Sequence, residues 1–127
     1  VSDDDIDILK KHDVSVAHCI SSNLKLGSGI APVKKLYDKG IRLTLGTDGA
    51  SSNNNLNMFE EMHMAAMVCR GITHDSNAIP ANEILRIATR NGALAQGRND
   101  CGCIDEAPQP GRAAAASRNR TDGRSCR

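Results

Sequence analysis

The sequence predicts an α/β fold in which helices cover a parallel sheet. Helix-like and strand-like segments alternate in the order α, β, α, β, α, α, and the two strand-like segments are almost continuously apolar: "VSVAH" (14–18) and "IRLTLG" (41–46). Parallel strands are usually buried on both faces and joined by helical crossovers, which accounts for both observations. The chain has 127 residues, enough for one modest domain.

Composition narrows the classes of function. Hydrophobic residues make up 39% of the chain but aromatic residues only 2%, so aliphatic side chains must build the core. The net charge of +1 favours no nucleic-acid partner, and no apolar run reaches the roughly 18 to 20 residues of a membrane span. Five irregularly spaced cysteines indicate reduced thiols. We therefore expect a cytoplasmic protein without nucleic-acid or membrane partners.

The first half of the chain contains two expected helices and two expected strands. Ser2 is the expected N-cap of a helix that ends near Asp13. The three acidic residues after Ser2 support this start, because negative charge in the first turn interacts favourably with the helix dipole. The stretch 19–31, "CISSNLKLGSGIA", follows the first strand and is expected to be a loop. Pro32 then begins a helix that Gly40 ends.

The second half is expected to be a loop followed by helices. The loop "TDGASSNNN" (47–55) leads into a helix over 57–70, where Asn57 and Glu60 have the spacing of a capping box. The apolar residues expected on the buried face of this helix are Phe59, Met62 and Ala66. Segment 79–97 is expected to form one helix or a helix pair, with apolar residues Ile84, Ile87 and Ala88.

Asp48 is the main candidate for a functional residue, because it directly follows the second strand in "LTLGTDGASSNNN" (43–55). Asp-Gly is a common turn dipeptide, so a turn residue is the simpler interpretation. The loop after it exceeds the roughly two to six residues of an ordinary connection, and small residues and amides suit a shaped loop near a ligand. His18 ends the first strand, so in a parallel sheet both side chains would emerge at one edge. A structural histidine remains the alternative.

Two segments together resemble a known family. "VAHCISSNLKLGSGIAPVKKL" (16–36) and "LTLGTDGASSNNNLNMFEEMHMAAM" (43–67) are similar to the amidohydrolase superfamily. The closest resemblance is to the branch with methylthioadenosine/S-adenosylhomocysteine deaminases and triazine chlorohydrolases, and it covers residues 1 to about 104. It implies the C-terminal portion of a metal-dependent (β/α)8 barrel, with 14–18 as the seventh strand and 41–46 as the eighth.

The resemblance also implies a site and a reaction. Asp48 would bind one divalent metal, zinc with iron as the alternative, while the other metal ligands, including a His-x-His pair, would lie upstream of Val1. Asp48 would also act in catalysis, taking a proton from water and delivering it to the leaving amine. His18, Ser22 and Asn23 would line the pocket or contact the substrate together with Asp48.

The implied substrate is a small nucleoside or nucleobase-like molecule. Deamination of methylthioadenosine or S-adenosylhomocysteine is the first expectation, and a guanine deaminase, cytosine deaminase or triazine hydrolase is the alternative. A different alternative is that these 127 residues have no activity alone, because two strands leave the sheet edges open. The full-length parent could form a homo-oligomer.

The end of the chain departs from the family. Residues 1–104 are expected to be the barrel part, and residues 105–127 a disordered basic tail. From residue 107 the sequence contains no Leu, Ile, Val, Met or aromatic residue, and five arginines against one aspartate give a net charge of +4. We interpret this tail as a frameshifted or mispredicted reading, which translation of the DNA in the other two frames tests. The start at Val1, without methionine or secretory signal, likewise indicates a fragment.

Overall fold

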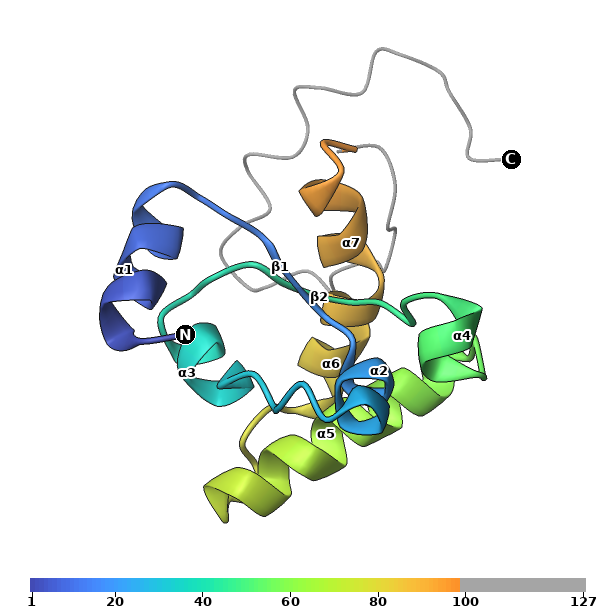
Figure 1. The fold of residues 1–127 in the computed structure, drawn as a ribbon. Helices are drawn as coiled ribbons and strands as arrows, with labels where there is room; N and C mark the ends of the chain where they lie inside the picture. The colour runs from blue at the N-terminus through green and yellow to red at the C-terminus, as the bar shows by residue number, and fades with distance from the viewer. Residues whose placement is uncertain (99–127) are drawn as a thin grey trace.

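The computed structural model describes residues 1–98 and confirms the parallel α/β arrangement (Figure 1). Strand β1 (Val16–His18) pairs in parallel with β2 (Leu43–Leu45), and the register sets Ala17 beside Thr44. Seven helices make up the remaining regular structure of the described part: α1 (Asp3–Lys11), α2 (Ile20–Leu26), α3 (Val33–Asp38), α4 (Ala50–Asn53), α5 (Met58–Thr73), α6 (Ala81–Ala88) and α7 (Arg90–Ala95).

The helix boundaries predicted from capping residues are confirmed. Ser2 caps α1, since its side chain accepts a hydrogen bond from the Asp5 backbone N–H and the Asp5 side chain accepts one from the Ser2 backbone N–H. Pro32 directly precedes α3. Gly40 lies two residues after the end of α3, and its φ of 69° is a left-handed conformation that favours glycine. These helix boundaries depend on residues that are neighbours in the sequence, and they can therefore be predicted from it.

The predicted loop 19–31 is wrong in its first half, because α2 occupies Ile20–Leu26. Two residues of this short helix are buried, Ile20 at 0% and Ser22 at 2% exposed, and left-handed Gly27 ends it. Serine and asparagine favour turns in isolation, but the burial of Ile20 and Ser22 outweighs that preference. The loop after β2 also contains a short helix, α4.

The buried face of α5 differs from the prediction at Phe59, whereas Met62 and Ala66 pack against the core as expected. Glu61, Ala65 and Cys69 are the buried residues, whereas Phe59 is 78% exposed. Because each residue turns an α-helix by about 100°, Phe59 lies on the opposite side from Glu61. The placement of Phe59 on the buried face was therefore wrong.

The start of α5 follows the prediction in part. Asn57 is the N-cap, and its side chain accepts a hydrogen bond from the Phe59 backbone N–H. Glu60 does not complete a capping box, since its carboxylate accepts a hydrogen bond from the Asn55 side chain instead.

The hydrophobic core lies between the strands and the helices α1, α3, α5 and α6. Its buried members are Ile6, Val33, Leu36, Ile41, Leu43, Cys69, Ala78, Ile79, Ile84 and Ile87. The segment 79–97 forms the predicted helix pair, which breaks at Thr89 (φ −123°, ψ −85°). As predicted, Ile84 and Ile87 face inward, and Ala88 is half-buried.

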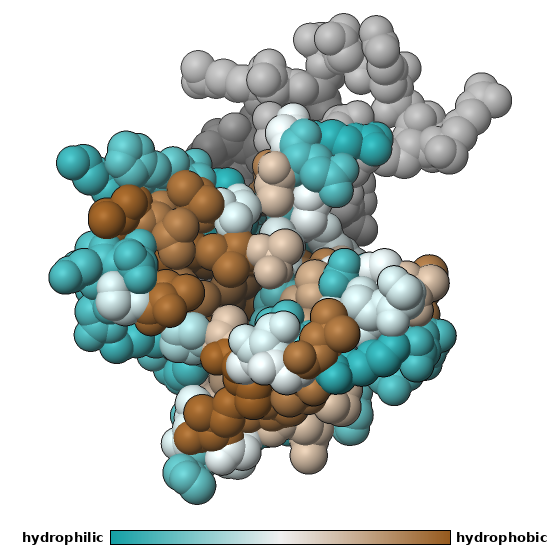
Figure 2. Space-filling view, in the orientation of Figure 1, coloured by the Kyte–Doolittle hydropathy of each residue, from teal (hydrophilic) through white to brown (hydrophobic). Residues whose placement is uncertain are grey.

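Large apolar side chains also lie on the surface, and Figure 2 shows apolar residues gathered on a hollowed face. Leu26 and Leu56 are 61% and 60% exposed. Scattered exposed leucines are ordinary, but contiguous apolar surface marks a region that contacts another surface.

No helix in residues 1–98 is long and apolar enough to cross a membrane. The predicted disordered tail, residues 105–127, lies outside the described residues, as do Cys101, Cys103 and Cys126.

Candidate active site

Asp48 lies three residues beyond the end of β2, and its carboxylate joins two separate segments. Its Oδ2 accepts a hydrogen bond of 2.6 Å from Ser22 Oγ on α2, and its Oδ1 accepts one of 2.8 Å from the Gly49 backbone N–H. These hydrogen bonds, that from Ser22 first, hold the pKa of the Asp48 carboxyl below its ordinary value. Asp48 is therefore an ionised carboxylate at neutral pH, next to the carboxyl end of the strand.

The backbone of Asp48 has turn geometry as well. Its φ of 60° lies in the left-handed region, which Asp tolerates better than most residues. The turn interpretation of Asp48 thus describes its backbone correctly. A turn does not require the contact between the Asp48 side chain and Ser22, 26 residues earlier, so turn geometry alone does not account for the position of this side chain.

Ser22 and Asn23 have different relations to Asp48. Ser22 is only 2% exposed, and its hydroxyl donates to Asp48. Asn23 is half-buried, and the hydrogen bonds that the structure shows for it are made by its backbone, with Cys19 and with Ser28. The structure therefore brings Ser22 to the Asp48 carboxylate and leaves Asn23 in the body of α2.

His18 ends β1 and is 3% exposed. It lies on the same face of the strand pair as Leu45, and it lines a cavity of about 350 Å³ between α3 and α5. Its Nδ1 is buried without a hydrogen-bond partner in the described part of the chain. Asp48 is exposed and does not line this cavity. His18 and Asp48, which were predicted to emerge at one edge of the sheet, therefore have different surroundings.

Burial lowers the pKa of His18, although the negative charge of Glu61 opposes that shift. As the pH falls, the His18 ring therefore becomes protonated near pH 6.5 in the unfolded chain, but only at a lower pH in the folded chain. Stability should be complete above that pH and should fall as the pH drops towards the folded pKa, by up to about 1.4 kcal/mol per pH unit.

Denaturant unfolding of the 127-residue chain at about pH 7.5 and about pH 5.5 measures this loss. His18→Gln should flatten the pH dependence, whereas His12→Gln, at the exposed end of α1, should retain it. An unchanged pH slope in His18→Gln would contradict the assignment of the effect to the buried histidine.

Glu61, which the sequence analysis missed, is the most buried charged residue in the described part, at 1% exposed. Its Oε1 accepts a hydrogen bond of 2.7 Å from Asn53 Nδ2, and its Oε2 accepts one of 3.4 Å from the Ser21 backbone N–H. Its position on α5, in line with Ala65 and Cys69 at intervals of four, was the available signal. An acid in a buried stripe needs polar partners.

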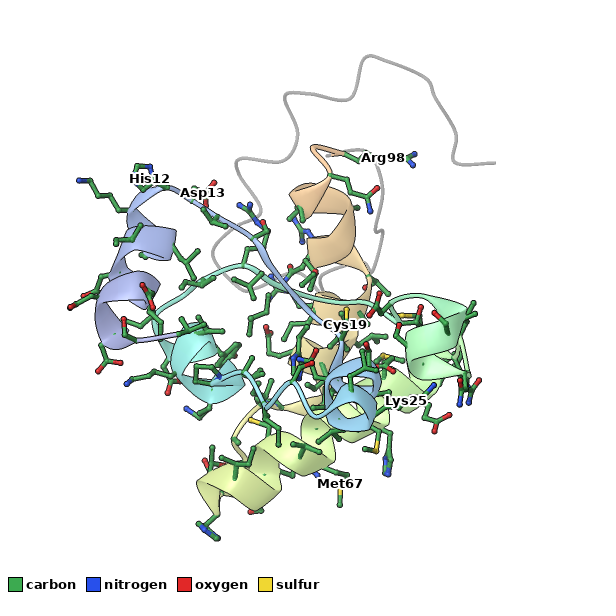
Figure 3. All side chains as sticks on the ribbon, in the orientation of Figure 1. His12, Asp13, Cys19, Lys25, Met67 and Arg98 are labelled. Carbon is green, nitrogen blue, oxygen red and sulfur yellow. The ribbon has the colours of Figure 1, made fainter. Side chains whose placement is uncertain are left out.

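Two hydrogen bonds of Lys25 and a close approach at Gly46 also bring the segments around Asp48 together. Lys25 extends from α2, and its Nζ donates to the Ser51 carbonyl at 2.7 Å and to Asn54 Oδ1 at 2.6 Å (Figure 3). A Cβ atom added at Gly46 would lie 3.2 Å from Cys19 Sγ, so glycine permits β2 to end close to the junction of β1 and α2. The Asp48 loop (residues 47–55) is thus held against α2 at Asp48, Ser51 and Asn54.

A divalent metal could use Asp48 as a ligand but needs more donors than this part of the chain supplies. An ionised carboxylate oxygen is a suitable donor for zinc or iron, and a catalytic zinc site normally has three protein ligands. Within residues 1–98 no three His, Cys, Asp or Glu side chains form a group that could hold a metal. The Asp48 carboxylate thus has the donor chemistry of one such ligand, and residues 1–98 do not supply the others.

Comparison with known proteins gives the same family over most of the chain. The sequence matches the amidohydrolase family over residues 1–108. It is 52% identical over 97 residues to a 5'-deoxyadenosine deaminase of Methanosarcina acetivorans, covering 76% of this chain and 22% of that protein. It is 47% identical over 106 residues to a 5-methylthioadenosine/S-adenosylhomocysteine deaminase of Dictyoglomus thermophilum, covering 84% of this chain and 25% of that protein. The chain thus spans about a quarter of the length of these relatives.

Solved structures agree. A zinc-bound adenosine deaminase from Xanthomonas campestris superposes with a TM-score of 0.77 at 41% identity, over 80% of this chain and 24% of that one. A triazine hydrolase variant superposes with a TM-score of 0.76 at 33% identity, over 84% of this chain and 24% of that one. These neighbours imply a TIM-barrel-type fold, of which the described residues form a part. The chain belongs to the amidohydrolase family.

Proposed function

We propose that this chain is the C-terminal part of a metal-dependent deaminase barrel, with β1 and β2 as its seventh and eighth strands. The observation that carries the proposal is the ionised carboxylate of Asp48, held at the carboxyl end of β2 by Ser22 from the segment after β1. Functional groups in barrels of this type gather at that end of the strands. The exposed apolar surface agrees with a part that packs against the rest of a barrel.

We further propose that the substrate is a nucleoside of the methylthioadenosine or S-adenosylhomocysteine type. Relatives named for deamination of such nucleosides share 47% to 54% identity with this chain. Guanine deaminase and triazine hydrolase structures are 28% to 33% identical. The difference supports the nucleoside, and the other two reactions are the second candidates on the same scaffold.

The proposed reaction is hydrolytic removal of an amino group from a purine ring. The oxygen of water adds to the ring carbon that carries the amino group, the carbon–nitrogen bond breaks, and ammonia leaves. Asp48 accepts a proton from the water and donates it to the departing nitrogen, as general base and then general acid. A divalent metal, zinc first and iron as the alternative, would supply a water whose pKa is lowered towards about 7.

The roles of the neighbouring residues are proposals too. Ser22 already donates its hydroxyl to Asp48, so we assign it to holding that carboxylate in place rather than to binding the substrate. Substrate contact by His18 and Asn23 stays a prediction, as do the cytoplasmic location and the oligomeric state.

The test is to express this chain together with the coding sequence upstream of Val1, with zinc present; we call the product the extended protein. It should release ammonia from methylthioadenosine or S-adenosylhomocysteine faster than from guanine or cytosine. A folded, zinc-loaded extended protein that releases ammonia from none of them contradicts the deaminase proposal. If the extended protein releases ammonia only from guanine or cytosine, the proposed nucleoside substrate is wrong and that alternative substrate takes its place.

A further inference from the structure

We propose that Glu61 and Asn53 are positioning residues that fix the place of Asp48, by tying the Asp48 loop to α2 through one closed ring of contacts. The ring itself depends only on the geometry of the described residues. Its effect on catalysis rests on the proposed function, so the two consequences are tested separately.

The ring has two arms that meet at adjacent residues. On one arm, Ser22 Oγ donates to Asp48 Oδ2 at 2.6 Å. On the other arm, Asn53 Nδ2 donates to the carbonyl of Thr47 at 2.7 Å and to Glu61 Oε1 at 2.7 Å. The second carboxylate oxygen of Glu61 then accepts from the backbone N–H of Ser21, next to Ser22, at 3.4 Å.

The two arms act on the same two points of the chain. One arm attaches to the backbone of Thr47 and the other to the side chain of Asp48, the residue that follows it. On α2, the arms attach to Ser21 and Ser22, which are also neighbours. The position of the Asp48 carboxylate relative to α2 is therefore set twice, by its own hydrogen bond and by the path through Glu61.

The choice of residue at position 61 supports a specific role. Ala65 and Cys69 continue the same buried face of α5, and a leucine at position 61 would bury apolar surface without the cost of desolvating a charge. A carboxylate gives up that advantage but offers two oxygens, which accept from two different segments at once. Asn53 matches it, because one amide nitrogen has two hydrogens and donates both here.

Hydrogen exchange on the full 127-residue chain tests the ring without any activity measurement. Glu61→Gln keeps the size of the side chain but leaves one acceptor oxygen in place of two. The backbone N–H groups of residues 49–54 should exchange at least about tenfold faster in this variant, while those of α6 keep their rates. Asn53→Ala should have the same effect.

The matched controls are Glu60→Gln and Asn55→Ala. The side chains of Glu60 and Asn55 contact each other and neither belongs to the ring, so neither change should alter exchange in residues 49–54 by more than about twofold. The proposal is overturned if Glu61→Gln and Asn53→Ala leave this exchange unchanged. It is also overturned if exchange rises equally in α6, which would indicate general loss of stability.

Kinetics of the extended protein test the catalytic consequence. Glu61→Gln should lower kcat by about 10- to 100-fold with a change in KM of about threefold or less, because the substrate still binds while the carboxylate is misplaced. Glu60→Gln should retain the parent kcat. If loop exchange responds but the parent releases no ammonia, the deaminase proposal fails and the ring stands. If the parent deaminates and Glu61→Gln retains both kcat and protection, the positioning proposal fails.

Discussion

Asp48→Asn should lower kcat of the extended protein by about 10²- to 10⁴-fold, the range expected when a general acid–base residue is lost. Asparagine has the same shape, and its carbonyl oxygen can still accept a hydrogen bond from Ser22. It cannot take up a proton from water or hand one to a leaving amine, and an amide oxygen is a weaker ligand for a metal than a carboxylate. Steady-state ammonia release over a range of substrate concentrations separates kcat from KM.

Asp13→Asn is the matched control for this substitution. Asp13 is also exposed and also has a left-handed backbone, with φ of 49°, but it lies after α1 and away from Cys19 at the junction of β1 and α2 (Figure 3). Its replacement should leave kcat within about twofold of the parent. If Asp48→Asn retains more than a tenth of the parent kcat, Asp48 is not the proton carrier and the proposed mechanism is wrong.

Leu43→Ala should lower the free energy of unfolding of the 127-residue chain by about 2–5 kcal/mol. Leu43 is 2% exposed and belongs to the core cluster, in the strand that leads to Asp48. Truncation removes buried apolar surface and leaves a cavity that the surrounding core residues can fill only in part. Urea denaturation followed by circular dichroism measures the difference.

The same substitution at Leu56 provides the control. Leu56 is 60% exposed between α4 and α5, so Leu56→Ala should change the free energy of unfolding by no more than about 0.5 kcal/mol. Equal losses in the two variants would mean that Leu43 is not buried against the helices.

The sequence was sufficient to predict the features that depend on neighbouring residues. The two strands and the caps at Ser2 and Asn57 follow from apolar runs and from side chains that bond to nearby N–H groups. Asp48 was identifiable because a carboxylate directly after an apolar strand in a long loop is unusual. The family resemblance of the chain rests on this stretch together with residues 16–36.

Features that depend on packing between distant segments were not predictable in this way. α2 forms because Ile20 and Ser22 are buried, and a window of local propensity does not contain that information. The buried face of α5 was placed on Phe59 because hydrophobicity alone favours it, although the residue that packs inward is Glu61. The structure reveals the partners that permit its burial.

The contact between Ser22 and Asp48 shows the same limit most clearly. The two residues are 26 positions apart, and each has an ordinary local explanation, a loop serine and a turn aspartate. Only the parallel pairing of β1 with β2 brings the segments that follow the two strands to one edge. The sequence predicted that edge, and the resemblance placed Ser22 and Asp48 in one pocket, but neither predicted the hydrogen bond between them.

Grafting is the most direct test of the proposal that this chain is a working part of a deaminase barrel. Residues 1–98 would replace the matching segment of the Dictyoglomus thermophilum deaminase, with zinc present and S-adenosylhomocysteine as the substrate. We expect the graft to release ammonia at a rate within about tenfold of the parent enzyme, and Asp48→Asn in the graft to remove that activity. A folded, zinc-loaded graft that releases no ammonia would contradict the proposal.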